Sequence, residues 1–176
     1  MKIFMSCSSQ DGVNEVYKES AKKIAELLAK DNDLVFGASS KGLMGIVYQE
    51  FKKNNRHITG ICYEMYKDLL DDLELDELVV TKTLGDTIRT LVENSDAMVF
   101  LPGSYGTLSE LIVTLELKRT KVHNKPIIIY NNNHYFDGIL SNIHTSYLDG
   151  CTTTDYDELC QVLHDEESVL SALNEL

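Results

Sequence analysis

Short apolar runs alternate with longer amphipathic segments along the whole chain, and this alternation constrains the fold more than any other feature. Runs such as "MVFL" and "IIIY" contain no polar positions, which is typical of strands that helices cover on both faces. The runs that we expect to form strands are 2–6, 33–37, 57–63, 77–82, 97–101, 126–131 and 160–164. The segments that we expect to form helices are 13–28, 43–51, 83–94, 107–118, 136–145 and one from Asp165 onward, with a short helix and an acidic loop over 64–78. We therefore predict a three-layer α/β fold with a doubly wound, mainly parallel sheet, in which residues 1–176 form one domain.

The charge of the chain argues against a nucleic-acid partner. The formal net charge is −12, and no run of lysine and arginine is longer than two residues. Nucleic-acid binding depends on clustered cations that neutralise phosphates, and no such cluster is present in the sequence. A small anionic ligand is compatible with this charge, because backbone amides at a helix N-terminus bind phosphate without a basic patch.

The four cysteines and the apolar runs indicate an ordinary reduced protein. Cys7 and Cys62 lie in or beside expected strands, where a buried thiol is common, and no cysteine has the spacing of a zinc ligand. We therefore expect no metal site, reduced thiols and a cytoplasmic location. No apolar run is long enough for a signal peptide or a membrane span, so we expect no membrane association.

Small and polar residues follow three of the expected strands, in the loops 6–11, 37–45 and 102–107. Parallel α/β sheets bind ligands outside the carboxyl ends of their strands, so these loops are the candidate site. In "LPGSYGTLSE", Gly103 and Gly106 permit close approach of a ligand to the backbone. The hydroxyls of Ser104 and Thr107, with the free amides and dipole of the following helix, would form a cradle for one phosphate group.

A purely structural interpretation of the same loop is also open. Thr107 and Glu110 have the T-x-x-E spacing of a capping box, in which the glutamate reaches back to the first amide of the helix. No Gly-Lys-Ser/Thr follows the glycines, so the loop is not that of a P-loop ATPase. The sequence likewise leaves open whether Tyr105 stacks on a base or flanks the pocket, or is simply an exposed aromatic residue of the loop.

The second loop, "FGASSKGLMG", is chemically similar to the first. It leaves a strand, contains Gly37, Gly42 and Gly45, and enters a helix, but it lacks the G-x-G-x-x-G pattern of dinucleotide-binding proteins. Lys41 would be a phosphate ligand if it turned inward, and we expect it to be solvated.

Several segments taken in order resemble the Lonely Guy (LOG) phosphoribohydrolase family, long mislabelled as lysine decarboxylases. "LPGSYGTLSE" resembles the family motif P-G-G-x-G-T-x-x-E, and "LVFGASSKGLMG" resembles V-Y-G-G-G-x-x-G-L-M-G. "IFMSCSS", "ENSDAMVFLPG", "KPIIIYNNNHYFDGIL" and "CQVLHDEESVLSAL" are similar to the opening strand, the segment before the motif, the segment after it and the tail. The resemblance implies a Rossmann-like domain, usually a homodimer, that cleaves the N-glycosidic bond of a nucleoside 5′-monophosphate. The products are a free base and ribose 5-phosphate, and no metal or organic cofactor is needed.

The resemblance, together with the chemistry of breaking an N-glycosidic bond, suggests roles for individual residues as hypotheses. Glu110 matches the acid of the motif and would support the positive charge that develops on the sugar ring. Asp86 or Arg89 would assist the water, the phosphate or the base. The residues expected to bind the substrate and its phosphate are Gly103, Ser104, Tyr105, Gly106, Thr107, Gly42, Met44 and Ser8.

Three departures from the family pattern bear on activity. Ser104 stands at the second glycine of the motif, and Ala38 and Ser39 replace two glycines of the second loop. Thr87 and Ile88 occupy the positions of an adjacent Arg-Lys pair in the family. Arg89 lies one residue further, which is about 100° around a helix, so it cannot substitute directly.

Three functions therefore remain open from the sequence. The first is hydrolysis of AMP or an N6-modified AMP, for which the partner is a small nucleotide. The second is a sensor of the same fold that binds a nucleotide without cleaving it. The third is transfer of a deoxyribosyl group between bases. Asp86 also has a structural alternative, since an acid in the first turn of a helix is favoured by the dipole.

Overall fold

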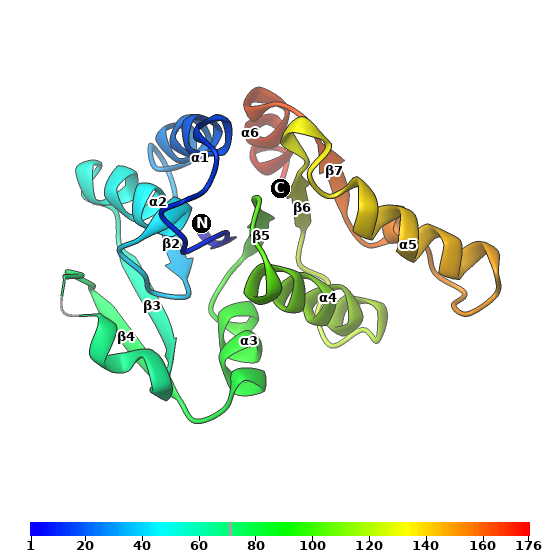
Figure 1. Ribbon diagram of the computed structural model, residues 1–176, viewed down its shortest axis with the longest axis horizontal. Helices are drawn as coiled ribbons and strands as arrows, with labels where there is room; N and C mark the ends of the chain where they lie inside the picture. The colour runs from blue at the N-terminus through cyan, green and yellow to red at the C-terminus, as the bar shows by residue number, and fades with distance from the viewer. Residues whose placement is uncertain (71) are drawn as a thin grey trace.

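The computed structural model describes residues 1–70 and 72–176 and contains a seven-stranded sheet in which every pair of neighbours is parallel. The order across the sheet is β4-β3-β2-β1-β5-β6-β7, so the chain winds outward from β1 in one direction and then from β5 in the other (Figure 1). This confirms the predicted doubly wound α/β fold. The strands are β1 (Lys2–Ser6), β2 (Asp33–Phe36), β3 (Ile58–Tyr63), β4 (Glu77–Thr81), β5 (Ala97–Phe100), β6 (Ile127–Tyr130) and β7 (Gln161–Leu163).

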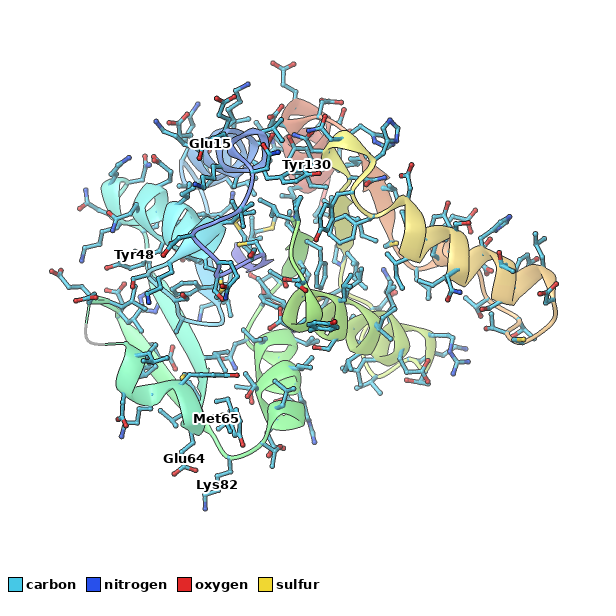
Figure 2. The ribbon with its side chains drawn as sticks, viewed as in Figure 1. Glu15, Tyr48, Glu64, Met65, Lys82 and Tyr130 are labelled. Carbon is cyan, nitrogen blue, oxygen red and sulfur yellow. The ribbon has the colours of Figure 1, made fainter. Side chains whose placement is uncertain are left out.

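Two layers of helices cover the sheet, and each has its own hydrophobic core (Figure 1). Within the described residues, the six helices with α geometry are α1 (Glu15–Leu28), α2 (Gly42–Lys53), α3 (Leu84–Glu93), α4 (Tyr105–Arg119), α5 (Asp137–Leu148) and α6 (Glu166–Asn174). Buried residues of α1, α2 and α6 pack in one core, and those of α3, α4 and α5 pack in the other. Figure 2 shows the ring of Tyr130, at the end of β6, directed toward the first of these layers.

Burial along the strands explains why the sequence pattern was so clear. All four residues of β5 and of β6 are buried, because helices cover both faces of the central sheet. Phe4 of β1 and Phe100 of β5 meet edge to face, with ring centroids 5.8 Å apart. The edge strand β4 is largely exposed, with only Thr81 buried, so its lower hydrophobicity follows from its place in the sheet.

Two expected segments differ in detail. The segment 64–78 contains a 3₁₀ helix, Glu64–Leu69, and Asp71 of its acidic loop lies outside the described residues. The helix that we expected over 107–118 begins two residues earlier, at Tyr105, and this shift changes the interpretation of the loop before it. In the described part of the chain, no helix has the length and hydropathy needed to span a bilayer.

The order of strands reverses between β1 and β5, and this switch point places three loops together. The Ser8 amide donates to the carbonyl of Pro102 at 3.0 Å, and the Leu101 amide donates to the carbonyl of Ser6 at 2.8 Å. The Met44 amide at the start of α2 donates to the carbonyl of Ser8 at 3.1 Å. The loops after β1, β2 and β5 therefore form one connected surface, as the sequence predicted.

Candidate functional site

The N-terminus of α4 points its free amides into this surface. The first backbone bond that closes the helix runs from the Leu108 amide to the Ser104 carbonyl at 2.8 Å. The amides of Tyr105, Gly106 and Thr107 therefore have no acceptor within the helix, and the Ser104 side chain does not cap them. Three adjacent N–H groups at the positive end of a 15-residue helix form an arrangement that attracts an anion.

The two glycines of the loop serve different purposes. A Cβ atom on Gly103 would lie 2.0 Å from the Thr107 hydroxyl and 3.1 Å from the Ser8 amide nitrogen, so only glycine fits there. A Cβ atom on Gly106 would meet nothing within 4 Å. The fold therefore requires Gly103 for packing but makes no such demand at Gly106, where the backbone is open to solvent or a ligand. Tyr105 beside it is 90% exposed.

Glu110 lies one turn into α4 and turns toward β1. The hydroxyl of Ser6, at the end of β1, donates a hydrogen bond to its Oε2 atom, and the carboxyl is partly buried. Burial raises the pKa of Glu110 from 4.5 to about 7, and the Ser6 hydrogen bond opposes this rise. A carboxyl with this pKa exchanges its proton near neutral pH, which is what acid–base chemistry on a substrate requires.

These contacts exclude the capping-box interpretation. The N-cap of α4 is Ser104, and Thr107 is already inside the helix. Glu110 contacts Ser6, which is 104 residues away in the sequence, and the Thr107 side chain is buried against Gly103. The structural alternative for the T-x-x-E spacing is therefore wrong.

The thiol of Cys7 lies next to this carboxyl. Cys7 is 6% exposed, and burial, with a smaller contribution from the charge of Glu110, raises its pKa well above the ordinary range. It is consequently protonated and unreactive at neutral pH. Cys62 is also buried, which confirms the predicted burial of both Cys7 and Cys62, and all four cysteines are free thiols.

The second loop packs tightly against the loop that follows β1. Gly42 has a φ of +60°, and a Cβ atom there would lie 2.6 Å from the backbone nitrogen of Gln10. Its amide donates to the Asp11 carboxylate at 2.9 Å. Ala38 has a φ of 54°, the conformation that favours glycine, at one of the positions where the family has that residue. Lys41 is exposed, as expected.

Glycine 42, Met44 and Ser8 are thus brought together, although part of their hydrogen-bonding capacity is used within the protein. The Ser8 hydroxyl accepts from the Gln10 amide at 3.2 Å, and the Ser8 carbonyl accepts from Met44. The loop that carries Ser8 borders the loop 102–107 through the contact between the Ser8 amide and the Pro102 carbonyl. Their expected role in substrate binding stays a prediction.

The two other candidate catalytic residues, on α3, contact groups other than Glu110. The Thr83 hydroxyl donates to the Asp86 carboxylate at 2.7 Å and accepts from the Asp86 amide at 3.1 Å. Arg89 is exposed and forms an ion pair with Glu93 at 2.7 Å. The structure therefore places Asp86 in its helix-capping role and Arg89 in a surface pair, and their catalytic roles stay predictions.

The positions that hold the Arg-Lys pair in the family are structural in this chain. The Thr87 hydroxyl shares a hydrogen bond with the Thr81 hydroxyl and donates to the Thr83 carbonyl. Thr87 is 5% exposed and Ile88 is 3% exposed, within the core. Lys82, the cation just before α3, points away from the body of the molecule (Figure 2).

Two residues at the site were not singled out from the sequence. Ser6 was only the first residue of a predicted loop, and nothing indicated that it would contact Glu110. The Tyr135 hydroxyl donates to the Gly103 carbonyl at 2.8 Å, from the connection after β6. Only the position of that connection, beside the loop 102–107 in a parallel sheet, could have suggested it.

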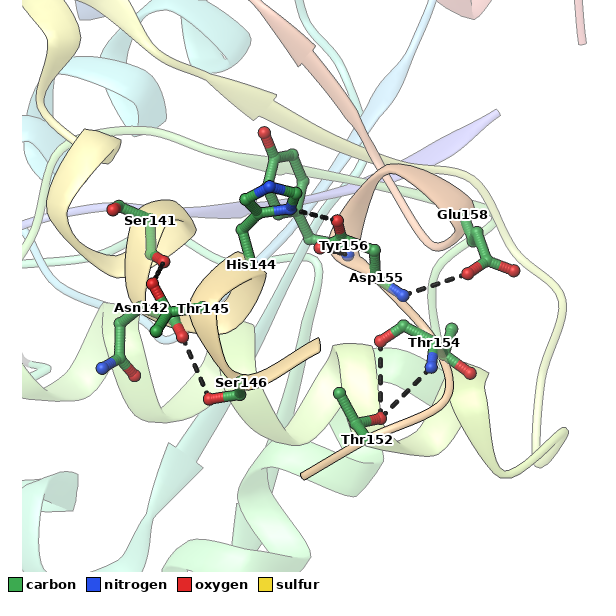
Figure 3. Close-up of polar contacts among 10 residues, drawn as sticks. All are labelled: Ser141, Asn142, His144, Thr145, Ser146, Thr152, Thr154, Asp155, Tyr156 and Glu158. Atoms are coloured by element: carbon green, nitrogen blue, oxygen red, sulfur yellow. Dashed lines mark hydrogen bonds and ion pairs between the residues drawn. The ribbon is translucent and has the colours of Figure 1, made fainter. Parts of the chain in front are cut away.

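A second polar cluster lies away from this site, between α5 and β7 (Figure 3). His144 forms a hydrogen bond through Nδ1 with the buried Asp155 carboxylate. The Asp155 amide donates to Glu158 at 3.0 Å, which completes a capping box on the 3₁₀ turn Tyr156–Glu158. The cluster joins α5 to the 3₁₀ turn that precedes β7, so these polar groups have a structural role.

The fold and this site together define the class of the protein, a Rossmann-like α/β protein with an uncapped helix N-terminus at the switch point. The family model described as "Possible lysine decarboxylase" matches residues 44–173. The chain belongs to this family, which includes the LOG proteins.

Plant relatives match most of the chain. It is 32% identical over 142 residues to the probable cytokinin riboside 5′-monophosphate phosphoribohydrolase LOG6 of Arabidopsis thaliana, covering 78% of this chain and 70% of that one. It is 30% identical over 152 residues to the rice protein LOGL2, which has the same descriptive name, covering 85% of this chain and 62% of that one.

Solved structures share the fold at low sequence identity. The molybdenum cofactor carrier protein of Chlamydomonas reinhardtii superimposes with a TM-score of 0.71 at 17% identity, covering 99% of this chain and 96% of that one. The protein TM1055 superimposes with a TM-score of 0.73 at 18% identity, covering 99% of both chains.

Proposed function

We propose that the protein hydrolyses the N-glycosidic bond of a nucleoside 5′-monophosphate, AMP or an N6-modified AMP, and releases a free base and ribose 5-phosphate. The observation that carries the proposal is the placement of Glu110 on the same helix whose first amides are free. Relatives about 30% identical, named for this reaction on cytokinin riboside 5′-monophosphates, support the same class of chemistry.

The geometry suits a substrate with an anionic end and a reacting sugar. Glu110 lies three to five residues after the free amides, or roughly 5–8 Å along the helix axis. A 5′-phosphate held by those amides would place the ribose over the carboxylate. Binding energy from the phosphate, remote from the bond that breaks, would then orient the sugar for reaction.

Glu110 would act on the sugar ring in its ionised form. Cleavage of the bond leaves positive charge on the ring, and a carboxylate beside it stabilises that charge. The Ser6 hydrogen bond favours the ionised carboxylate and holds it in one orientation. In this proposal Asp86 or Arg89 assists the water or the leaving base after a rearrangement of α3 side chains.

Base release from a panel of nucleoside monophosphates tests the proposal. Glu110→Gln keeps the shape of the side chain and removes its charge, so we expect base release to fall at least about a hundredfold. Glu116→Gln is the matched control, because Glu116 is on the same helix, exposed and paired with Arg119. If Glu110→Gln released base as fast as the wild-type protein, the role of this carboxylate would be wrong.

One observation favours a second candidate function, a nucleotide sensor that binds without cleavage. Thr87 and Ile88 are buried where the family has two cations, so α3 provides no basic side chain at those positions. Calorimetry with AMP, combined with chromatography for free adenine, separates the two functions. Binding without release of adenine from any monophosphate would favour the sensor.

We also propose that the protein forms a homodimer. The helices expected at the interface, α3 and α4, bury most of their apolar residues in the core, but Leu84, Ile112 and Val113 are 52%, 40% and 37% exposed. A hollow of about 520 Å³ beside Ile112 lies between α4 and the return from α5. Light scattering on purified protein should give twice the chain mass of 19.9 kDa, and Ile112→Asp should reduce it. A mass of one chain at all concentrations would refute the dimer.

A further inference from the structure

The hydroxyl of Tyr135 reaches the phosphate loop from a neighbouring element. Strand β6 lies next to β5, so the connection that follows β6 runs beside the loop that follows β5. From that connection the Tyr135 hydroxyl donates to the carbonyl oxygen of Gly103 at 2.8 Å.

The connection holds this tyrosine firmly. Its ring meets the ring of Tyr17 at 5.3 Å and that of Phe136 at 5.2 Å, both edge to face. Phe136 is 1% exposed, and its amide donates to the Asn131 side chain at 2.7 Å. The tyrosine is 39% exposed, and these two ring contacts hold one side of it and give its hydroxyl a defined direction.

The Gly103 carbonyl is the group whose direction most needs such a contact. Glycine has no side chain to restrict its backbone, so the peptide between Gly103 and Ser104 is intrinsically free to rotate. That peptide is planar and trans, so its N–H group, on Ser104, points opposite to its carbonyl. A hydrogen bond that holds the Gly103 carbonyl consequently also sets the direction of the Ser104 amide.

We infer that Tyr135 is a positioning residue for phosphate binding, whose hydroxyl holds the Gly103–Ser104 peptide so that the Ser104 amide joins the free amides of α4. The inference rests on the proposed function, because it assigns the phosphate of the same substrate to these amides. Tyr135 does not touch the reacting bond. It acts on phosphate affinity and leaves the chemical step to Glu110.

Tyr135→Phe removes the hydroxyl and keeps the ring contacts. Tyr17→Phe is the matched control, because it removes the hydroxyl from the other ring of the same edge-to-face pair. We expect Tyr135→Phe to weaken binding of AMP and of inorganic phosphate by about 3- to 10-fold, the range for loss of one hydrogen bond, and Tyr17→Phe to leave both unchanged. Adenosine, which has no phosphate, should bind both variants as it binds the wild-type protein. In kinetics, KM for AMP should rise while kcat changes less than about twofold.

Each outcome decides a different point. If the wild-type protein binds neither AMP nor phosphate, the proposed function fails and the inference fails with it. If the wild-type protein binds AMP and Tyr135→Phe binds it equally well, the inference alone is overturned. Equal weakening of adenosine and AMP would also overturn it, because the hydroxyl would then act on the whole pocket.

A measurement on the wild-type protein avoids any variant. Titration with inorganic phosphate should shift the NMR amide signal of Ser104 together with those of Tyr105, Gly106 and Thr107. If the last three signals move and the Ser104 signal does not, the Ser104 amide faces elsewhere and the inference is wrong.

Discussion

Glutamate 110 should destabilise the fold at alkaline pH, and Glu110→Gln should relieve this. The pKa of its carboxyl is raised from 4.5 to about 7, chiefly by burial. In the unfolded chain the carboxyl ionises near its ordinary pKa, whereas in the folded protein it resists ionisation until pH 7. The contribution of Glu110 to the free energy of unfolding is therefore greatest below pH 4.5, and it is lost as the pH rises through 7.

The size of the effect follows from the same values. At 1.36 kcal/mol per pH unit, raising a pKa from 4.5 to about 7 corresponds to roughly 3 kcal/mol. Because Glu110 is only partly buried, we reduce this figure to about 2 kcal/mol. This is the amount by which the stabilisation from Glu110→Gln, measured as free energy of unfolding, should be larger at pH 8.5 than at pH 5. For a chain of this length, about 2 kcal/mol corresponds to about 4–8 °C in Tm.

Urea unfolding of the wild-type protein and of Glu110→Gln at pH 5 and pH 8.5 measures this stabilisation directly. Glu110→Gln should be more stable than the wild-type protein at pH 8.5 and closer to it at pH 5. Glu116→Gln should be slightly less stable than the wild-type protein by a similar amount at both pH values, because Arg119 lowers the pKa of Glu116 and its stabilising ionised form is already present at pH 5. A gain for Glu110→Gln that is the same at both pH values would refute the reasoning, since it would mean that the carboxyl is not desolvated by folding.

Two further predictions concern the same site. Ser6→Ala removes the hydrogen bond that lowers the pKa of Glu110. The acid limb of the pH profile of kcat/KM should therefore move up by about one pH unit. An unchanged acid limb would mean that another group titrates there. Gly106→Ala should fold with an unchanged or higher Tm, because its Cβ atom meets nothing within 4 Å. It should bind AMP about tenfold more weakly, because the methyl group lies where a phosphate would approach. Calorimetry and thermal unfolding check both halves, and normal AMP affinity would show that no ligand approaches Gly106.

The sequence by itself determined the elements and the class of fold. The apolar runs predicted parallel strands, and the observed sheet has all seven expected strands in a doubly wound order, although the edge strand β4 is largely exposed. The glycine-rich loops were placed correctly at the carboxyl ends of the strands because strand direction and connection length are local properties. The same local pattern left the T-x-x-E spacing undecided between a cap and a ligand site, since both interpretations use residues within one helical turn.

Only the tertiary structure decided what Glu110 contacts and how readily it ionises. Its partner Ser6 is 104 residues away, and its raised pKa arises from burial that exists only after β1 and α4 pack together. The contact of Tyr135 with Gly103 and the burial of Thr87 have the same origin, because each depends on which elements become neighbours in the sheet. Periodicity along a chain reports which residues are covered, whereas pKa values and hydrogen bonds between distant residues depend on what covers them.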